Sequence, residues 1–312
     1  MTEIGLIFHW GLYSVPAFDD PDSVSRRRTF NGSEWYQARL LEKGTYRPIS
    51  GYKETQKYHH EQYHDAPYDD FQDQFKAELW NPQQWMDIAK SINATYVILT
   101  AKHHDGYCLW NTKTTKRNSM KTGSHSDLLE RFAECAKKNG LKFGIYYSWM
   151  EFDANVTINY IDNIVVPQVT ELIEYNPDIW WFDGSWKVKS KYAINAVHKL
   201  ISVMKLKNSK VEINDRIPEN LGMTYNVFAD RYLPNQSINS TIPWEHINTI
   251  GYSWGANKMA KEYKSGKELH QLYSKVRSLN GKFLLNVGPL ANGTILPQEL
   301  QSLNELSTIL LH

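Results

Sequence analysis

The sequence predicts an α/β fold, a (β/α)8-like TIM-type barrel with a long insertion after the first strand, and three observations support it. Short apolar runs rich in β-branched and aromatic residues alternate with amphipathic stretches of helical period. Polar residues follow the apolar part of several of these runs. The 312 residues also suit one barrel, which needs about 250 residues plus insertions.

The apolar runs are the candidate strands, and the amphipathic stretches between them are the candidate helices. Strand-helix alternation implies a parallel sheet with helical crossovers, either an open doubly wound sheet or a closed barrel. The predicted strands lie within 5–11, 94–107, 141–149, 178–186, 210–216 and 282–290, and the predicted helices within 81–92, 126–140 and 167–176.

The positions of the polar residues favour the barrel. In FHWG, LTAKHHDGY, WWFDGSW and INDR, polar side chains come at the carboxyl end of the predicted strand, so several strands contribute to one rim. A barrel assembles its site from the loops after many strands, whereas a doubly wound sheet concentrates its site at one switch point. No Gly-rich phosphate loop follows any run, which argues further against a nucleotide-binding sheet.

We expect residues 1–312 to form a single catalytic domain. Residues 16–73 are polar, aromatic and rich in His, Tyr and Arg, and we predict that they form an ordered insertion, a lid over the active-site rim. A solvated charged surface is the alternative for the SRRR run within it. The start Met-Thr-Glu lacks the pattern of a signal peptide, so we expect a cytoplasmic protein.

The composition bounds the partners. Lys plus Arg (35) nearly cancel Asp plus Glu (34), so the basic field that nucleic-acid binding requires is not expected. No run approaches the roughly 18 apolar residues of a membrane span. The two cysteines form no Cys-x-x-Cys pair, and we expect neither a metal nor a cofactor. The 11 Trp and 19 Tyr, often beside His and carboxylates, suit a sugar site or a packed core. Homo-oligomer formation is left open.

Asp183 is the first candidate for chemistry, because the apolar run that precedes it delivers one carboxylate to the rim. Its alternative role is to cap the next helix. His103 and His104 suit recognition of hydroxyl groups, or of a metal if His9 joins them, and each taken alone is more often a packing residue.

Three further residues follow along the chain. Arg216 ends another predicted strand and can hold a substrate hydroxyl, orient a carboxylate or form a structural ion pair. Asp230 and Glu245 both lie in the predicted loop after that strand. Glycoside hydrolysis needs two carboxylates, one to attack the anomeric carbon and one to protonate the leaving oxygen. The sequence thus offers acids from two strand ends on one rim.

Several motifs, taken in order, resemble those of the α-L-fucosidases of glycoside hydrolase family 29, and the match spans nearly the whole chain. The most specific are the His-His-Asp-Gly run and the closing Asn-Val-Gly-Pro followed by Asn-Gly-Thr. The motifs are FHWGLYSVPAF, SEWY, LTAKHHDGYCLW, KFGIYYSWMEF, WWFDGSW, INDR, PWEH and LLNVGPLANGTI.

The resemblance implies a retaining exo-α-L-fucosidase that acts on fucosylated oligosaccharides or glycans by double displacement. It assigns the nucleophile to Asp183 and the general acid/base to Asp230, with Glu245 as the second choice. Residues that bind the fucose hydroxyls in the family correspond to His9, Glu34, Trp35, His103, His104, Tyr147 (with Tyr146 as the alternative), Trp181 and Arg216.

The chain departs from the family pattern in two respects. Asp230 is one methylene shorter than the usual glutamate, which motivates the alternative of a catalytically weak, lectin-like fucose-binding protein. The final predicted helix ends close to residue 312, so we expect the C-terminal β-sandwich of many members to be absent. A metal-dependent barrel hydrolase that uses His9, His103 and His104 is the second alternative.

Overall fold

The structure, a computed structural model, describes residues 3–20, 32–42, 50–235 and 241–311. In these ranges the strands form one sheet in which every neighbouring pair is parallel, in the order β5-β4-β3-β2-β1-β7-β6. The strands are β1 (Ile4–Phe8), β2 (Tyr96–Lys102), β3 (Lys142–Ser148), β4 (Ile179–Asp183), β5 (Glu212–Ile213), β6 (Glu245–Thr249) and β7 (Lys282–Val287).

An irregular segment, 224–227, lies between the two edge strands of this sheet. On one side the Thr224 amide donates to the Ile213 carbonyl at 2.7 Å. On the other side the Asn226 amide donates to Pro243 and its carbonyl accepts from Glu245, at 2.9 and 2.8 Å. The segment thus takes the place of an eighth strand, and the predicted α/β barrel is confirmed with one irregular member.

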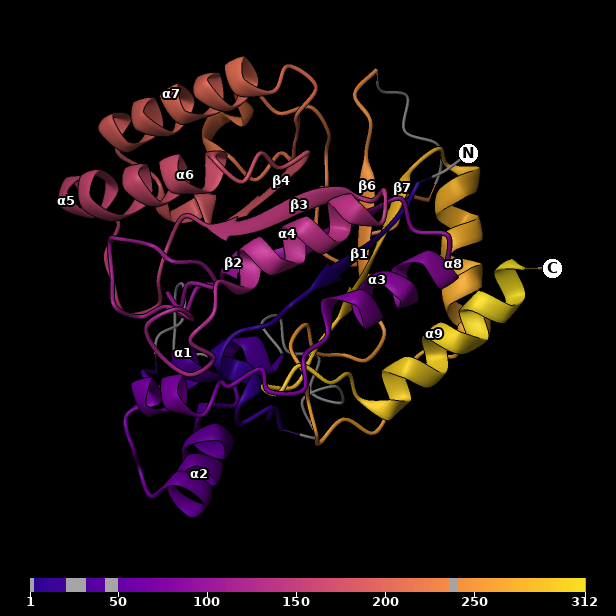
Figure 1. Ribbon diagram of the computed structural model, residues 1–312, viewed down its shortest axis with the longest axis horizontal. Coiled ribbons are helices and arrows are strands. Elements are labelled where there is room, and N and C mark those ends of the chain that lie inside the picture. The colour runs from indigo at the N-terminus through magenta and orange to yellow at the C-terminus, as the bar shows by residue number, and fades with distance from the viewer. Residues whose placement is uncertain (1–2, 21–31, 43–49, 236–240, 312) are drawn as a thin grey trace.

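Helices cover the outside of the sheet, as the predicted alternation requires. Figure 1 shows α3, α4, α6, α7, α8 and α9 around the strands, with α1 and α2 set apart at the lower left. The α-helices are α1 (Tyr36–Leu40), α2 (Tyr52–Tyr63), α3 (Pro82–Ser91), α4 (Leu128–Lys138), α5 (Ile158–Tyr160), α6 (Val166–Ile173), α7 (Lys191–Lys207), α8 (Gly266–Ser278) and α9 (Pro297–Leu310).

Local capping explains where the predicted helices begin and end. The Asp127 side chain accepts a hydrogen bond from the Glu130 amide and so caps α4, which ends before Gly140 at a φ of +73°. The Asn81 side chain accepts from the Gln83 amide and Pro82 is the first residue of α3. The helices predicted within 81–92, 126–140 and 167–176 are confirmed as α3, α4 and α6.

The strands separate two cores because successive side chains point to opposite faces. One core fills the space between strands and helices and includes Phe8, Tyr147 and Phe182. The other fills the barrel and includes Tyr146 and Trp181. A side chain's place in the strand alternation therefore decides whether it can reach the mouth of the barrel.

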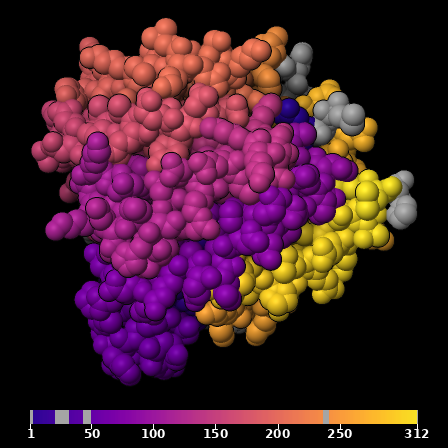
Figure 2. Space-filling view, in the orientation of Figure 1, coloured from indigo at the N-terminus to yellow at the C-terminus, as the bar shows by residue number. Residues whose placement is uncertain are grey.

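The described part of the insertion lies between β1 and α3. It contains the short 3-10 turn η2 (Ser33–Trp35), followed by α1 and α2. Figure 2 shows the residues around α2, in purple, projecting at the lower left of the molecule. The SRRR run, 25–28, lies outside the described residues, and the lid stays a prediction. No helix within the described ranges is both long enough and apolar enough to cross a membrane.

Candidate active site

A cavity of about 510 Å³ opens at the carboxyl ends of the strands. Polar and aromatic side chains from separate strands and from the insertion line it, as the rim argument predicts. They are His9, Glu34, Trp35, His103, His104, Tyr146, Trp181, Asp183, Trp186, Arg216, Phe228, Ala229, Asp230, Arg231, Ile247 and Trp254.

Asp183, the last residue of β4, holds its carboxylate among three polar groups. Arg216 Nη1 donates to Oδ1 at 3.1 Å, and the Tyr146 hydroxyl donates to Oδ2 at 2.9 Å. His104 Nε2 lies 3.5 Å from Oδ2. Burial by itself raises the pKa of Asp183, but the Arg216 charge and the bonds from His104 and Tyr146 outweigh it and hold the pKa below its usual range. These contacts favour the ionised form of the carboxylate.

The three histidines converge on the same wall. His9 follows β1, and its Nδ1 lies 2.5 Å from Asn286 Oδ1. Burial lowers the pKa of His9 to about 4, and it also lowers that of His103 well below the usual value. His103 stacks on Tyr146 with ring centroids 5.4 Å apart, and its Nδ1 is buried without a hydrogen-bond partner among the described residues. Two neutral imidazoles thus face the cavity, and neutral imidazole can donate to or accept from a hydroxyl.

Glu34 and Trp35 reach the cavity from the insertion. Glu34 Oε2 accepts from the amides of Trp254 and Gly255 at 3.2 and 3.1 Å. Burial raises the pKa of Glu34 to about 7. Its Oε1 is buried and has no hydrogen-bond partner in the part of the chain that the structure describes. An unpartnered buried oxygen at a cavity wall is ready to bind a ligand hydroxyl.

Arg216 connects the two acids on which the sequence prediction depends. Its Nη1 contacts Asp183, its Nη2 contacts Asp230 Oδ1, and its guanidinium carbon lies 4.5 Å from the centroid of the Trp181 ring. Another residue of the INDR motif, Asn214, holds the strand end that carries Arg216 next to β4. The Asn214 side chain exchanges two hydrogen bonds with the Phe182 backbone, both 3.0 Å long, and so extends the pairing of β5 with β4.

The assignment of Tyr147 to the cavity is wrong. Tyr147 lies opposite Phe182 in the β3–β4 pair and shares its outward face. Its hydroxyl donates to Gln168 Oε1 at 2.8 Å, beneath the helices. Tyr146, the alternative, lines the cavity because strand alternation turns it inward.

The placement of Glu245 in a loop is also wrong, because Glu245 is the first residue of β6. Its side chain is 1% exposed and lies inside the barrel, where it accepts from the Tyr96 hydroxyl at 2.7 Å and from Trp181 Nε1 at 3.0 Å. It does not line the cavity. Of the two candidates for the second acid, only Asp230, whose side chain is 40% exposed, lines the cavity with Asp183.

Sequence reasoning missed six of the cavity residues, namely Trp186, Phe228, Ala229, Arg231, Ile247 and Trp254. Trp186 stands in the quoted WWFDGSW motif, three residues after Asp183, so its place at a strand end was a usable signal. Arg231 follows Asp230 and lies over the ring of Trp254, 4.7 Å from its centroid. No pattern around Trp254 links it to the rim, since β6 itself is not predicted.

Among the residues that the structure describes, no side chains of the cavity are arranged to suit a metal ion. Across the described ranges, no group of three or more His, Cys, Asp or Glu side chains is placed to ligate one. His9 and His103 instead meet at an edge, with ring centroids 5.7 Å apart.

Comparison with known proteins places this arrangement in a family. The family model described as Alpha-L-fucosidase matches residues 2–311. An alpha-L-fucosidase of Dictyostelium discoideum is 31% identical over 94% of this chain and 65% of its own length. The tissue alpha-L-fucosidase of Homo sapiens is 29% identical over 95% of this chain and 63% of its own. The chain thus spans slightly less than two thirds of these curated relatives.

Solved structures agree. The crystal structure of the Thermotoga maritima alpha-fucosidase is 32% identical and superposes with a TM-score of 0.82, over 98% of this chain and 72% of that one. The same enzyme in complex with fucose has the same TM-score. With the family model covering nearly every residue and this cavity at the strand ends, the chain belongs to the alpha-L-fucosidase family.

Proposed function

We propose that this chain is a retaining exo-α-L-fucosidase that removes terminal α-linked L-fucose from oligosaccharides or glycoconjugates. The observation that carries the proposal is the ionised Asp183 at the floor of a cavity whose walls offer unpartnered Glu34 Oε1 and His103 Nδ1. Membership of the family and the fucose complex of the Thermotoga maritima relative supply the identity of the sugar.

The proposed mechanism uses two carboxyl groups held by one guanidinium. Asp183 attacks C1 of the fucoside, the glycosidic C–O bond breaks, and Asp230 protonates the departing oxygen. Asp230 then removes a proton from water, which attacks C1 and releases Asp183. Contacts of both acids with Arg216 support the short separation of about 5 to 5.5 Å that retaining enzymes use.

The walls of the cavity support recognition of a deoxy sugar. Neutral His9 and His103 and the carboxyl group of Glu34 suit hydroxyl groups, while Trp35, Trp181 and Trp254 contribute apolar ring atoms to the lining. A sugar with several ring hydroxyls and a methyl group matches this division between polar and apolar walls.

Hydrolysis of an aryl α-L-fucoside tests the proposal. Wild type should release α-L-fucose first, as NMR of the earliest product shows, because two inversions at C1 retain the configuration. Asp183→Ala should lose at least about 1000-fold in kcat, since no residual group replaces the nucleophile. Azide should restore activity to this variant and yield the β-fucosyl azide. Initial release of the β-anomer contradicts the mechanism.

Asp230→Ala should show a loss that depends on the leaving group. A dinitrophenyl fucoside needs little protonation and should keep its first step, whereas a fucosyl disaccharide should lose about 100- to 10000-fold in kcat/KM. Asp87→Ala, on the exposed face of α3, is the matched control and should leave both rates unchanged. Equal losses on the two substrates would remove Asp230 from the acid/base role.

One observation favours the lectin-like alternative. Arg216 Nη2 contacts Asp230 Oδ1, so this oxygen faces the guanidinium and not a leaving group. A wild-type protein that binds fucose yet never cleaves a dinitrophenyl fucoside would establish that alternative and refute the proposed activity.

A further inference from the structure

A bulge at the end of β2 turns two neighbouring side chains to opposite sides of the sheet. β2 and β3 pair in regular register up to Thr100 and Tyr146, and then Lys102 lies opposite Tyr147. The extra residue in β2 places Lys102 with Tyr147 on the helix side, while His103 enters the cavity and stacks on Tyr146. Bulges beside active sites commonly re-aim side chains in this way.

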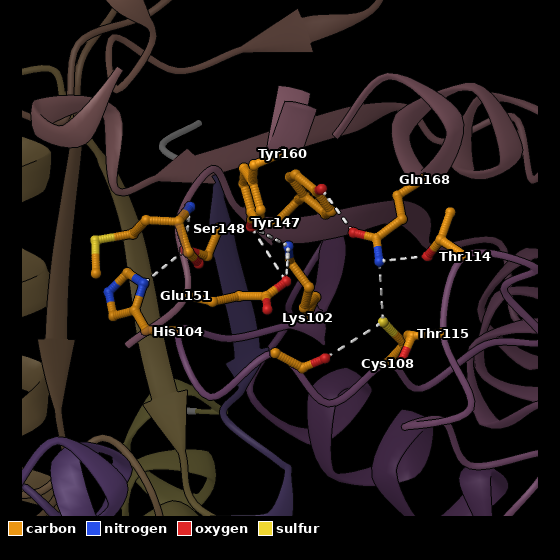
Figure 3. Close-up of polar contacts among 12 residues, drawn as sticks. Lys102, His104, Cys108, Thr114, Thr115, Tyr147, Ser148, Glu151, Tyr160 and Gln168 are labelled. Atoms are coloured by element: carbon orange, nitrogen blue, oxygen red, sulfur yellow. Dashed lines mark hydrogen bonds and ion pairs between the residues drawn. The ribbon is translucent and has the colours of Figure 1, made fainter. Parts of the chain in front are cut away.

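Lys102 is a buried cation with specific partners. Its side chain is 0% exposed, and its Nζ donates to Glu151 Oε1 at 3.0 Å and to the Tyr160 hydroxyl at 3.1 Å. The same hydroxyl donates to Glu151 Oε1 at 3.1 Å, and Nζ lies 4.6 Å from the centroid of the Tyr147 ring. Figure 3 shows the Lys102 ammonium, the Glu151 carboxyl group and the Tyr160 hydroxyl converging next to Tyr147.

Glu151 belongs to a short segment, 148–152, and two other residues of this segment form hydrogen bonds with His104. Ser148 Oγ lies 2.6 Å from His104 Nδ1, and the Phe152 amide donates to the His104 carbonyl at 2.7 Å. In Figure 3, His104 and Ser148 lie on one side of this segment and Lys102 and Glu151 on the other. The segment 148–152 therefore contacts the end of β2 at Lys102 and contacts the chain again at His104.

The same segment contacts the strand ends that carry the other reacting groups. The Trp149 amide donates to the Asp183 carbonyl at 2.9 Å, and Trp149 Nε1 donates to the Arg216 carbonyl at 3.1 Å. A shift of 148–152 would thus move His104 relative to Asp183 and Arg216. The Lys102–Glu151 contact lies where it can prevent that shift.

We propose that Lys102 and Glu151 are a positioning pair that fixes His104 against Asp183, an inference that rests on the proposed function. A buried ion pair contributes little net stability compared with apolar side chains of the same size, but its contacts are directional. Displacement of a reacting group by about 1 Å costs on the order of 100-fold in rate. Neither side chain lines the cavity, so the pair acts through 148–152 and His104.

Glu151→Gln tests the pair because it keeps the shape and removes the charge. Activity toward an aryl α-L-fucoside should fall about 10- to 100-fold in kcat/KM. Calorimetry with L-fucose should show weaker binding at an unchanged stoichiometry of about one site per chain. Glu171→Gln is the matched control, because Glu171 also accepts two hydrogen bonds, from Trp110 Nε1 and the Lys113 amide, away from 148–152. It should leave both measurements unchanged.

A double-variant cycle separates positioning from loss of folded protein. If the pair acts through His104, Glu151→Gln should add less than about twofold to the loss caused by His104→Ala. A fall in the number of binding sites at unchanged fucose affinity would show a purely structural role and overturn the proposal. Should Glu151→Gln fail to fold, Tyr160→Phe removes one hydroxyl of the same network and should give a smaller loss in the same direction.

The outcomes also distinguish this inference from the proposed function. A wild type that binds fucose but does not cleave the aryl fucoside refutes the function, while the change of fucose affinity in Glu151→Gln still tests the pair. An active wild type, together with Glu151→Gln of full activity and affinity, refutes the pair alone.

Discussion

Tyr146 and Tyr147 are chemically identical neighbours, and the strand gives them different tasks. The Tyr146 hydroxyl bonds the Asp183 carboxylate inside the cavity, while the Tyr147 hydroxyl bonds Gln168 beneath the helices. A hydrogen bond to a charged group contributes about 1.5 to 3 kcal/mol, more than one between neutral groups. The two hydroxyls should therefore differ in what their removal does.

Tyr146→Phe should lower kcat/KM for an aryl fucoside by about 10-fold or more, because Asp183 loses a donor that orients its carboxylate. Tyr147→Phe, the matched control, should keep kcat/KM within about threefold and lower the free energy of unfolding by about 1 kcal/mol. Steady-state kinetics and urea unfolding of both variants check this. The reverse ranking in activity would mean that the inward face of β3 is assigned wrongly.

The site residues that the sequence predicts well are those that end strands. Asp183, His103 and Arg216 follow apolar runs, so their place on the rim needs no knowledge of register. The choice between Tyr146 and Tyr147 does need it, and the sequence offers only a weak sign: Tyr146 shares a face with Gly144 and Ser148, the small residues of β3. The placement of Glu245 was wrong for a related reason. The strand that it begins has only five residues, and its polar sequence EHINT is typical of a loop.

At the scale of elements, local sequence patterns predict most strands and helices of the barrel. They do not predict how the barrel closes. The run YVIL, for example, predicts the strand β2 because burial on both faces favours consecutive apolar residues. The segment 224–227 closes the barrel through backbone bonds to Ile213, Pro243 and Glu245, which have no signature in side-chain periodicity. Its position depends on contacts between residues far apart in sequence, so only the folded structure reveals it.

Inside the barrel, the ring of Tyr96 packs directly against Gly5. A Cβ atom on Gly5 of β1 would lie 2.2 Å from Tyr96 ring atoms, and the hydroxyl of that ring bonds Glu245. The absence of a side chain at Gly5 thus leaves room for Tyr96, the largest inward side chain of β2.

Gly5→Ala should lower the free energy of unfolding by about 1 to 3 kcal/mol, because the new methyl group displaces a ring held at both ends. Urea unfolding measures the cost. In a Tyr96→Leu background, which removes the ring atoms that the methyl meets, the same substitution should cost less. An equal cost in the two backgrounds would show that the effect is not a collision with Tyr96.

At the scale of the whole molecule, burial of acidic groups makes folding depend on pH. Burial raises the pKa of Glu34 and of Glu245 to about 7, and that of Glu299 to about 8. Each carboxyl binds its proton more tightly in the folded chain than in the unfolded one, so each contribution to stability is present below pH 4.5 and is lost as pH rises through the folded pKa. His9, whose pKa burial lowers to about 4, acts oppositely and contributes above pH 6.5.

Glu299→Gln isolates one of these contributions. Glu299 is 3% exposed and its Oε2 accepts a hydrogen bond from the Gly288 amide at 3.1 Å, which an amide oxygen can also accept. Near pH 4.5 the two chains should be about equally stable, because the folded wild type is protonated there. As pH rises to about 8, the wild type must either ionise a buried group or keep a proton that the unfolded chain has released. The variant should become more stable than wild type by on the order of a few kcal/mol over this range.

Urea midpoints measured at intervals from pH 5 to pH 8 give the difference, and the histidine contributions cancel because both chains carry them. A difference that stays constant across these pH values would mean that Glu299 is ionised in the folded protein throughout.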